Sequence, residues 1–235
     1  MGDASLTAVI VPAAGRGERL GPGAPKALRT LAGQPILLHA VRNLATARAI
    51  DLIVVAVPED AVEESRALLA GIEIPLTIVS GGDTRQDSVA RALLALPPEV
   101  DVVLVHDAAR PLVPAEVVDR VAAAVRGGAE AVIPTLGVVD TIKEVDGDGI
   151  VRATLDRSRL HAVQTPQGFD RDVLQQAHAA SDGEDATDDA GMVERMGLTV
   201  CVVPGHEEAF KITRPLDLVL AEAILVRRRA AGGVG

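Results

Sequence analysis

The chain is poor in cysteine and in aromatic residues. Its 235 residues include one cysteine, Cys201, two phenylalanines, no tryptophan and no tyrosine. A single cysteine excludes an internal disulfide and a cysteine-based zinc site, and it fits a reducing cytosol. Hydrophobic residues make up 48% of the chain and aromatic residues 1%. The core therefore has to be built from Val, Leu, Ile and Ala.

Other features are missing as well, and each absence disfavours a class of protein. No basic leader precedes Thr7, and no apolar run approaches the ~20 residues of a membrane span. The formal net charge of −10 disfavours a general binder of nucleic acid or of anionic membranes. The Gly-x-Ser-x-Gly motif of acyl transfer does not occur. We expect a soluble, cytoplasmic protein with neither nucleic acid nor a membrane as partner.

Aliphatic runs alternate with helix-like patterns along the first part of the chain. The runs cover residues 6–12, 52–57, 76–79, 102–105 and 131–134, and apolar residues at helical spacing fill 36–44, 61–69, 87–96 and 117–125. This succession predicts an α/β fold, a Rossmann-like doubly wound and mostly parallel sheet with right-handed crossovers. In such sheets ligands bind beyond the carboxyl ends of the strands.

The pattern changes after Thr135. Residues 138–145 and 150–155 read as two strands joined by the turn Asp146-Gly147-Asp148-Gly149. A lone hairpin is marginal in water, so we expect it to pack on a second copy of the chain. The prediction is one domain, 1–235, with a protruding β-hairpin arm at 137–160 that makes a homodimer. The last helix is expected to start at Pro215 and to end in a solvated arginine run, 227–229.

A glycine-rich loop with basic residues follows the first strand. It carries Gly15, Gly17, Gly21 and Gly23 together with Arg16, Arg19 and Lys26. Backbone N–H groups of such a loop form a concavity for anions, and the basic side chains add charge. It is neither a dinucleotide fingerprint, because Leu20 takes the place of the third glycine, nor a P-loop, because Pro25 precedes Lys26. We predict a polyphosphate site in which Arg19 and Lys26 neutralise charge on the phosphorus under attack.

Two further segments stand at predicted strand ends. Gly81-Gly82-Asp83 with Ser88 suits hydrogen bonding to a base edge, or equally a helix start capped by Asp83 or Thr84. In His106-Asp107-Ala108-Ala109-Arg110, the aspartate suits Mg²⁺ or a hydroxyl and the arginine a phosphate. A plain salt bridge between the two is the alternative. His106 has no second histidine at metal spacing and is assigned a structural role.

Taken in order, these blocks resemble a known family over most of the chain, from Val9 to about Ala221. They are Pro12-Ala13-Ala14-Gly15, Pro25-Lys26, Gly81-Gly82-Asp83, His106-Asp107-Ala108-Ala109-Arg110-Pro111, Thr165-Pro166-Gln167 and Lys211-Ile212-Thr213-Arg214-Pro215. The resemblance is to the 2-C-methyl-D-erythritol 4-phosphate cytidylyltransferases of non-mevalonate isoprenoid biosynthesis. It implies transfer of CMP from CTP to a polyol phosphate, with release of pyrophosphate, Mg²⁺ or another divalent cation as cofactor, and a homodimer that exchanges the hairpin arms.

The resemblance also assigns residues. It implies that Arg19 and Lys26 are the catalytic residues. The implied contacts with CTP are Pro12, Ala13, Ala14, Gly15, Gly82, Asp83, Ser88 and Ala108. The implied contacts with the acceptor are Asp107, Arg110, Thr141, Arg157, Thr165 and Lys211. Thr141 and Arg157 would reach over from the partner subunit, and Asp107 is the candidate metal ligand. The chain departs from the family pattern at Glu208-Ala209-Phe210. A ribitol-5-phosphate cytidylyltransferase and a non-catalytic nucleotide-binding regulator are the alternatives, although the regulator would not need Arg19 and Lys26 together.

Overall fold

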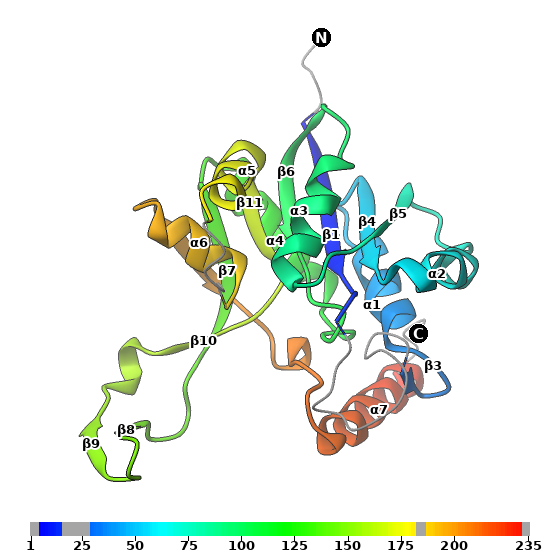
Figure 1. Ribbon diagram of the computed structural model, residues 1–235. Coiled ribbons are helices and arrows are strands. Elements are labelled where there is room, and N and C mark those ends of the chain that lie inside the picture. The colour runs from blue at the N-terminus through cyan, green and yellow to red at the C-terminus, as the bar shows by residue number, and fades with distance from the viewer. Residues whose placement is uncertain (1–4, 16–28, 182–186, 232–235) are drawn as a thin grey trace.

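The computed structural model describes residues 5–15, 29–181 and 187–231, and in them a central sheet runs through the molecule (Figure 1). Its strands are β1 (Leu6–Pro12), β4 (Leu52–Val57), β5 (Leu76–Ser80), β6 (Val100–Val105), β7 (Ala131–Gly137), β10 (His161–Val163), β11 (Gln167–Asp170) and β12 (Val200–Pro204). They lie in the order β10-β7-β11-β6-β1-β4-β5, and β12 pairs with β7.

Most neighbours in this sheet are parallel, as the sequence predicts. β1 pairs in parallel with β4 and β6, β4 with β5, and β12 with β7. β11 is antiparallel to both β6 and β7, and β10 is antiparallel to β7. The short β11 was missed because its sequence, Gln-Gly-Phe-Asp, lacks an aliphatic run. Gly168 is required there because helix packing is close, and a Cβ would stand 2.5 Å from Cγ1 of Val121.

Helices cover both faces of the sheet, so the doubly wound prediction is confirmed (Figure 1). They are α1 (Ile36–Ala45), α2 (Val62–Leu69), α3 (Arg85–Leu94), α4 (Ala115–Arg126), α5 (Arg171–Ala179) and α6 (Asp189–Arg195), with a 3₁₀ turn, η3 (Glu59–Ala61), before α2. Val9 and Val11 of β1 pack in one apolar cluster with α1, α2 and α4. Ala8 and Ile10 pack in a second cluster with α3, α5 and α6. The alternation follows from the two-residue period of a strand.

The start of α3 differs from the predicted 87–96 because of its cap. The Thr84 hydroxyl accepts the N–H of Asp87 at 3.0 Å, and the Asp87 carboxylate accepts the N–H of Thr84 at 3.1 Å. This reciprocal capping box satisfies two donors that a helix start would leave open. The helix therefore begins at Arg85, two residues earlier than predicted.

The arm leaves the body between β7 and β10 (Figure 1). Its two strands, β8 (Lys143–Val145) and β9 (Val151–Thr154), are shorter than the predicted 138–145 and 150–155, and a 3₁₀ turn, η4 (Arg157–Arg159), follows them. Asp146 explains where β8 stops, because its Oδ1 accepts the N–H groups of Asp148 and Ile150 and so closes the turn. Val145 and Ile150 remain 50% and 56% exposed.

The C-terminal helix α7 (Pro215–Ala230) packs on a small third cluster that includes Leu31 and Ile212, beside the short strands β2 (Thr30–Leu31) and β3 (Gln34–Pro35). The prediction of a solvated arginine run was wrong for Arg228, whose side chain is only 27% exposed. Arg227 and Arg228 both pair with Glu208 of the 3₁₀ turn η5 (Glu207–Ala209), and Arg228 also donates to the Leu112 carbonyl at 2.7 Å. No helix in the described part of the chain is long and apolar enough to cross a membrane.

Candidate active site

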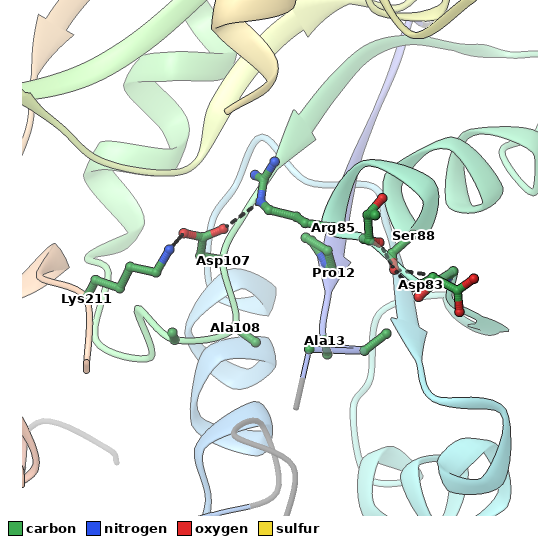
Figure 2. Close-up of a pocket in the computed structure, with 13 residues that line it drawn as sticks. Pro12, Ala13, Asp83, Arg85, Ser88, Asp107, Ala108 and Lys211 are labelled. Atoms are coloured by element: carbon green, nitrogen blue, oxygen red, sulfur yellow. Dashed lines mark hydrogen bonds and ion pairs between the residues drawn. The ribbon is translucent and has the colours of Figure 1, made fainter. Parts of the chain in front are cut away.

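A pocket that contains most of the predicted site residues lies where the winding of the sheet reverses. From β1 the chain goes to β4 and β5 on one side and then returns to β6 on the other. The loops after β1 and β6 diverge there and leave a crevice. Its described lining consists of Pro12, Ala13, Ala14, Gly15, Gly82, Asp83, Thr84, Arg85, Ser88, Asp107, Ala108, Ala109 and Lys211 (Figure 2). The predicted catalytic residues Arg19 and Lys26 lie outside the described residues.

One half of the pocket is a floor of small residues. The Ser88 hydroxyl accepts the Gly82 N–H at 3.1 Å and donates to the Thr84 carbonyl at 2.9 Å, so it fixes the turn after β5. At Gly81 a Cβ would stand 2.7 Å from the Cβ of Ala14. The two backbone segments therefore approach as closely as they do only because one carries a glycine. The structure brings all eight predicted CTP contacts to this pocket.

The other half is built on the loop after β6, which buried hydrogen bonds hold in place. The Asp107 N–H donates to Oγ1 of Thr165 at 3.1 Å, and that oxygen also lies 3.1 Å from Nδ1 of His106. The other ring nitrogen of His106 lies 3.1 Å from the Arg110 carbonyl. Burial lowers the pKa of His106 to about 4, so the ring is neutral at pH 7. Thr165 is buried behind Asp107 rather than in the pocket lining.

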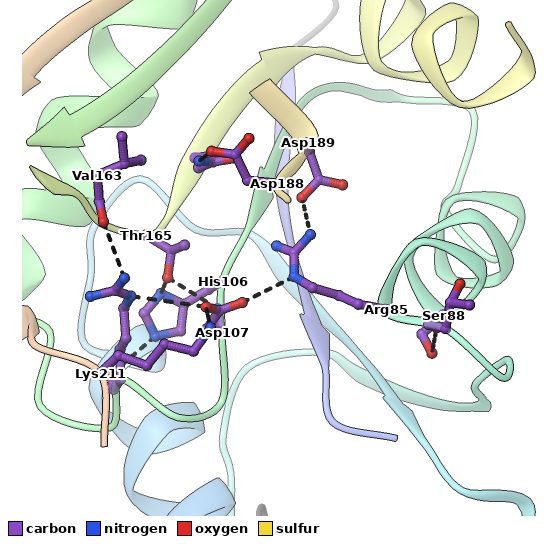
Figure 3. A network of polar contacts seen from close by, with 12 residues as sticks. Arg85, Ser88, His106, Asp107, Val163, Thr165, Asp188, Asp189 and Lys211 are labelled. Atoms are coloured by element: carbon purple, nitrogen blue, oxygen red, sulfur yellow. Dashed lines mark hydrogen bonds and ion pairs between the residues drawn. The ribbon is translucent and has the colours of Figure 1, made fainter. Parts of the chain in front are cut away.

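Asp107 is surrounded by positive charge (Figure 3). Lys211 Nζ lies 2.7 Å from Oδ2, Arg85 Nε 3.1 Å from Oδ1, and Arg110 Nε 4.0 Å from Oδ2. Burial alone would raise the pKa of Asp107, but Arg85, Lys211 and Arg110 hold it well below its usual range. The carboxylate is therefore ionised throughout the neutral range, and the cluster of four groups carries net positive charge.

The same surroundings argue against Asp107 as a metal ligand. Both of its oxygens already accept from a cation, and the three positive side chains within 4.0 Å of the carboxylate would repel a metal ion. Over residues 5–15, 29–181 and 187–231 no three His, Cys, Asp or Glu side chains gather in a way that could hold a metal ion. The described side chains therefore do not fit a protein-held cation.

Arg110 is less exposed than a free phosphate ligand would be. Its Nη1 donates to the Ala209 carbonyl at 2.8 Å and its Nη2 to the Val163 carbonyl at 3.2 Å, and the side chain is 12% exposed. Burial lowers its pKa. Ala209 belongs to the segment where the chain departs from the family pattern, but only its backbone oxygen is used. Glu208 of the same segment is engaged by the arginines of α7.

Sequence reasoning missed two residues of this site. Arg85 contacts Asp107 and, through Nη1 at 2.6 Å, also Asp189. Asp189 is fully buried and lies 3.2 Å from His178. Arg85 lies on α3, His178 on α5 and Asp189 on α6, so no local spacing pattern in the sequence links them. The only available signal was the acidic segment Asp188-Asp189, which had no evident counter-charge in the sequence.

Two predicted acceptor contacts are not in the pocket of their own chain. Thr141 and Arg157 are exposed on the arm, which projects away from the body (Figure 1). Arg157 donates to the Val139 carbonyl within the arm. Neither residue is among those that line the pocket. Their role in the site of a neighbouring subunit stays a prediction.

A floor of small residues lies beside a positively charged cluster at the switch point of a doubly wound sheet, where such sheets bind their ligands. The fold matches solved structures of the α/β nucleotidyltransferase class. The family model described as 2-C-methyl-D-erythritol 4-phosphate cytidylyltransferase matches residues 7–227. The chain belongs to this family and is a cytidylyltransferase.

Similar proteins cover nearly the whole chain. A Streptomyces avermitilis protein named 2-C-methyl-D-erythritol 4-phosphate cytidylyltransferase is 57% identical, over 97% of this chain and 94% of its own length. The crystal structure of the protein of that name from Thermus thermophilus has a TM-score of 0.75 at 37% identity, with 94% of this chain and 98% of that chain covered. The crystal structure of 4-diphosphocytidyl-2C-methyl-D-erythritolsynthase from Anaerococcus prevotii has a TM-score of 0.83 at 29% identity, with 95% and 99% covered. These similarities do not favour the ribitol-5-phosphate alternative.

Proposed function

We propose that the chain transfers CMP from CTP to 2-C-methyl-D-erythritol 4-phosphate, giving 4-diphosphocytidyl-2-C-methyl-D-erythritol and pyrophosphate. The observation that carries the proposal is that the floor of small residues and the charged cluster around Asp107 lie side by side in one pocket. The small-residue floor suits a nucleotide, and the cluster of Asp107 with Lys211, Arg85 and Arg110 directly beside it suits a hydroxylated phosphate. Family membership identifies the two substrates.

The reaction needs little acid–base chemistry. A phosphate monoester has a second pKa of about 6, so at neutral pH the acceptor is largely a dianion. One of its oxygens forms a bond to the α-phosphorus of CTP, the bond from that phosphorus to the bridging oxygen of the β-phosphate breaks, and pyrophosphate leaves. The neutral His106 and the strongly ionised Asp107 do not suit a proton-transfer role, in agreement with a reaction driven by positioning and charge.

Each half of the site then has its own task. The loops at Ala14 and Gly82 and the start of α3 at Ser88 hold the cytosine base and ribose of CTP, together with Pro12, Ala13, Gly15, Asp83 and Ala108. Asp107 accepts hydrogen bonds from acceptor hydroxyls through its remaining lone pairs, and Lys211 faces the acceptor phosphate. Arg110 and Thr165 mainly fix the loop that carries Asp107, because the Thr165 hydroxyl and Nη1 and Nη2 of Arg110 are used there. Arg19 and Lys26 are proposed to neutralise the α-phosphate.

The divalent cation expected of the class is proposed to accompany the triphosphate of CTP rather than to sit on Asp107. The assembly is proposed to be a cytoplasmic homodimer of single-domain subunits joined through the arm, 137–160. Support comes from exposed apolar residues on the arm, Val139 at 83% and Val151 at 54%, since a surface of this kind favours burial against a partner. Thr141 and Arg157 would then complete the neighbouring site.

Pyrophosphate release tests the proposal. The purified chain is given CTP, UTP, ATP or GTP with Mg²⁺ and either 2-C-methyl-D-erythritol 4-phosphate or ribitol 5-phosphate. We expect release with CTP and the methylerythritol phosphate, and much less with every other pairing. Preference for ribitol 5-phosphate would establish that alternative instead. Binding of CTP in calorimetry without release in any pairing would identify a regulator and refute the enzyme.

A further inference from the structure

Arg85 lies at the junction of the two halves of the pocket. It is the first residue of α3, directly after the cap Thr84 and three positions before Ser88. Its side chain points across the pocket to Asp107 (Figures 2 and 3). Nε donates to Oδ1 of Asp107 at 3.1 Å, and Nη1 donates to Oδ2 of Asp189 at 2.6 Å. One guanidinium thus bridges two carboxylates that come from different parts of the chain.

The far carboxylate, Asp189, is an anchor. Its side chain is fully buried, and its second oxygen lies 3.2 Å from Nε2 of His178 on α5. Burial would raise the pKa of Asp189, but the charge of Arg85 and the contact with His178 hold it below the usual value. An ionised carboxylate withdrawn from water requires such partners. The guanidinium of Arg85 is therefore fixed to α6 through Nη1, while its Nε donates to Asp107.

This bridge constrains the near carboxylate in a way that Lys211 cannot. Lys211 contacts Oδ2 through a single ammonium on a flexible stem, and its side chain is 37% exposed. With that contact alone the Asp107 carboxylate could turn about its Cβ–Cγ bond, which is a soft torsion. A planar guanidinium on Oδ1, itself fixed to a buried group, sets the plane of the carboxylate.

We propose that Arg85 is a positioning residue for the polyol phosphate acceptor. By bridging Asp107 and Asp189 it orients the Asp107 carboxylate toward the acceptor hydroxyls. The proposal rests on the proposed function of Asp107 as an acceptor contact. It differs from two other roles open to a pocket residue. A direct ligand of CTP would change the KM for the nucleotide, and a purely structural ion pair would change stability without changing either KM.

Steady-state kinetics of Arg85→Gln and Arg85→Lys test the proposal, with CTP and the methylerythritol phosphate varied in turn. Loss of one charge-assisted hydrogen bond to Asp107 is expected to raise the acceptor KM about tenfold in Arg85→Gln. The KM for CTP should change less than about twofold. Arg85→Lys keeps the charge but cannot bridge both carboxylates, so the expected KM is intermediate. Arg66→Gln on the exposed surface of α2 is the matched control and should leave both KM values unchanged.

Arg85→Gln leaves Asp189 buried without its cation, so the double variant Arg85→Gln/Asp189→Asn is measured beside it. It removes both charges together and should retain the fold while keeping the raised acceptor KM. Unchanged KM values in a folded variant, or a rise confined to CTP, would overturn the proposal. The wild-type assay comes first: if the wild-type chain uses no polyol phosphate, the proposed function itself fails, before any variant is compared.

Discussion

Replacement of Asp107 by asparagine should expose how much the charge cluster stabilises the protein. The carboxylate accepts from Lys211 at 2.7 Å and from Arg85 at 3.1 Å, and its side chain is 12% exposed. An asparagine has one acceptor oxygen, so one of the two contacts is lost and the other becomes a bond to a neutral group. A hydrogen bond to a charged group contributes about 1.5–3 kcal/mol. We expect Asp107→Asn to lower the free energy of unfolding at pH 7 by about 2 kcal/mol.

The pH dependence of this effect has a definite sign. The pKa of Asp107 is lower in the folded protein than in the unfolded chain, where an aspartate titrates near 3.9. A group of this kind contributes its full stability above the unfolded pKa, and the contribution is lost as pH falls toward the folded pKa. The difference between wild type and Asp107→Asn should therefore be constant from about pH 7 to 5 and shrink below about pH 4.

Urea denaturation of both proteins between pH 7 and pH 3.5 measures the difference directly. Thermal melts should show a midpoint about 4–8 °C lower for the variant at pH 7, given a chain of this size. Asp101→Asn is the matched control, because Asp101 is an exposed aspartate on β6, the strand that leads to Asp107, and its replacement should cost little. A difference that stays the same down to pH 3.5, or a variant as stable as wild type at pH 7, would contradict the electrostatic argument.

Two further predictions concern the nucleotide floor and the arm. A Cβ on Gly82 would stand 2.2 Å from the Cβ of Asp87, so Gly82→Ala should displace the capping box and raise the KM for CTP at least tenfold, with little change for the acceptor. Equal effects on the two KM values would contradict this assignment. If the arms are exchanged, the separately impaired variants Arg157→Gln and Lys211→Met should regain roughly a quarter of wild-type activity after they are mixed and refolded. A mixture no more active than its components would refute exchange.

The sequence was sufficient for the framework of the fold and for most of the pocket. Strands made of Val, Ile and Leu are recognisable from their composition, and Gly82, Ser88 and Asp107 follow directly from the ends of such strands. The sequence did not predict β11, because the need for a glycine at position 168 becomes clear only once α4 is seen to pack against that strand. The same limit applies to Arg85 and Asp189. Whether a charged residue is solvated or buried beside a counter-charge depends on which elements the tertiary fold brings together.

The antiparallel strand β11 has a consequence for the order in which the two halves of the pocket form. The nucleotide floor depends on β1, β4, β5 and α3, all of which precede β6 in the chain. The acceptor half needs Gln167 to pair with Val105 and Thr165 to hold Asp107, contacts that close a long loop containing α4, β7 and the arm. Closing a long loop loses more chain entropy, and this loss comes before the contacts that offset it have formed. Because Lys211 reaches Asp107 across a separation of 104 residues as well, we expect the site for the nucleotide to form before the site for the acceptor during folding.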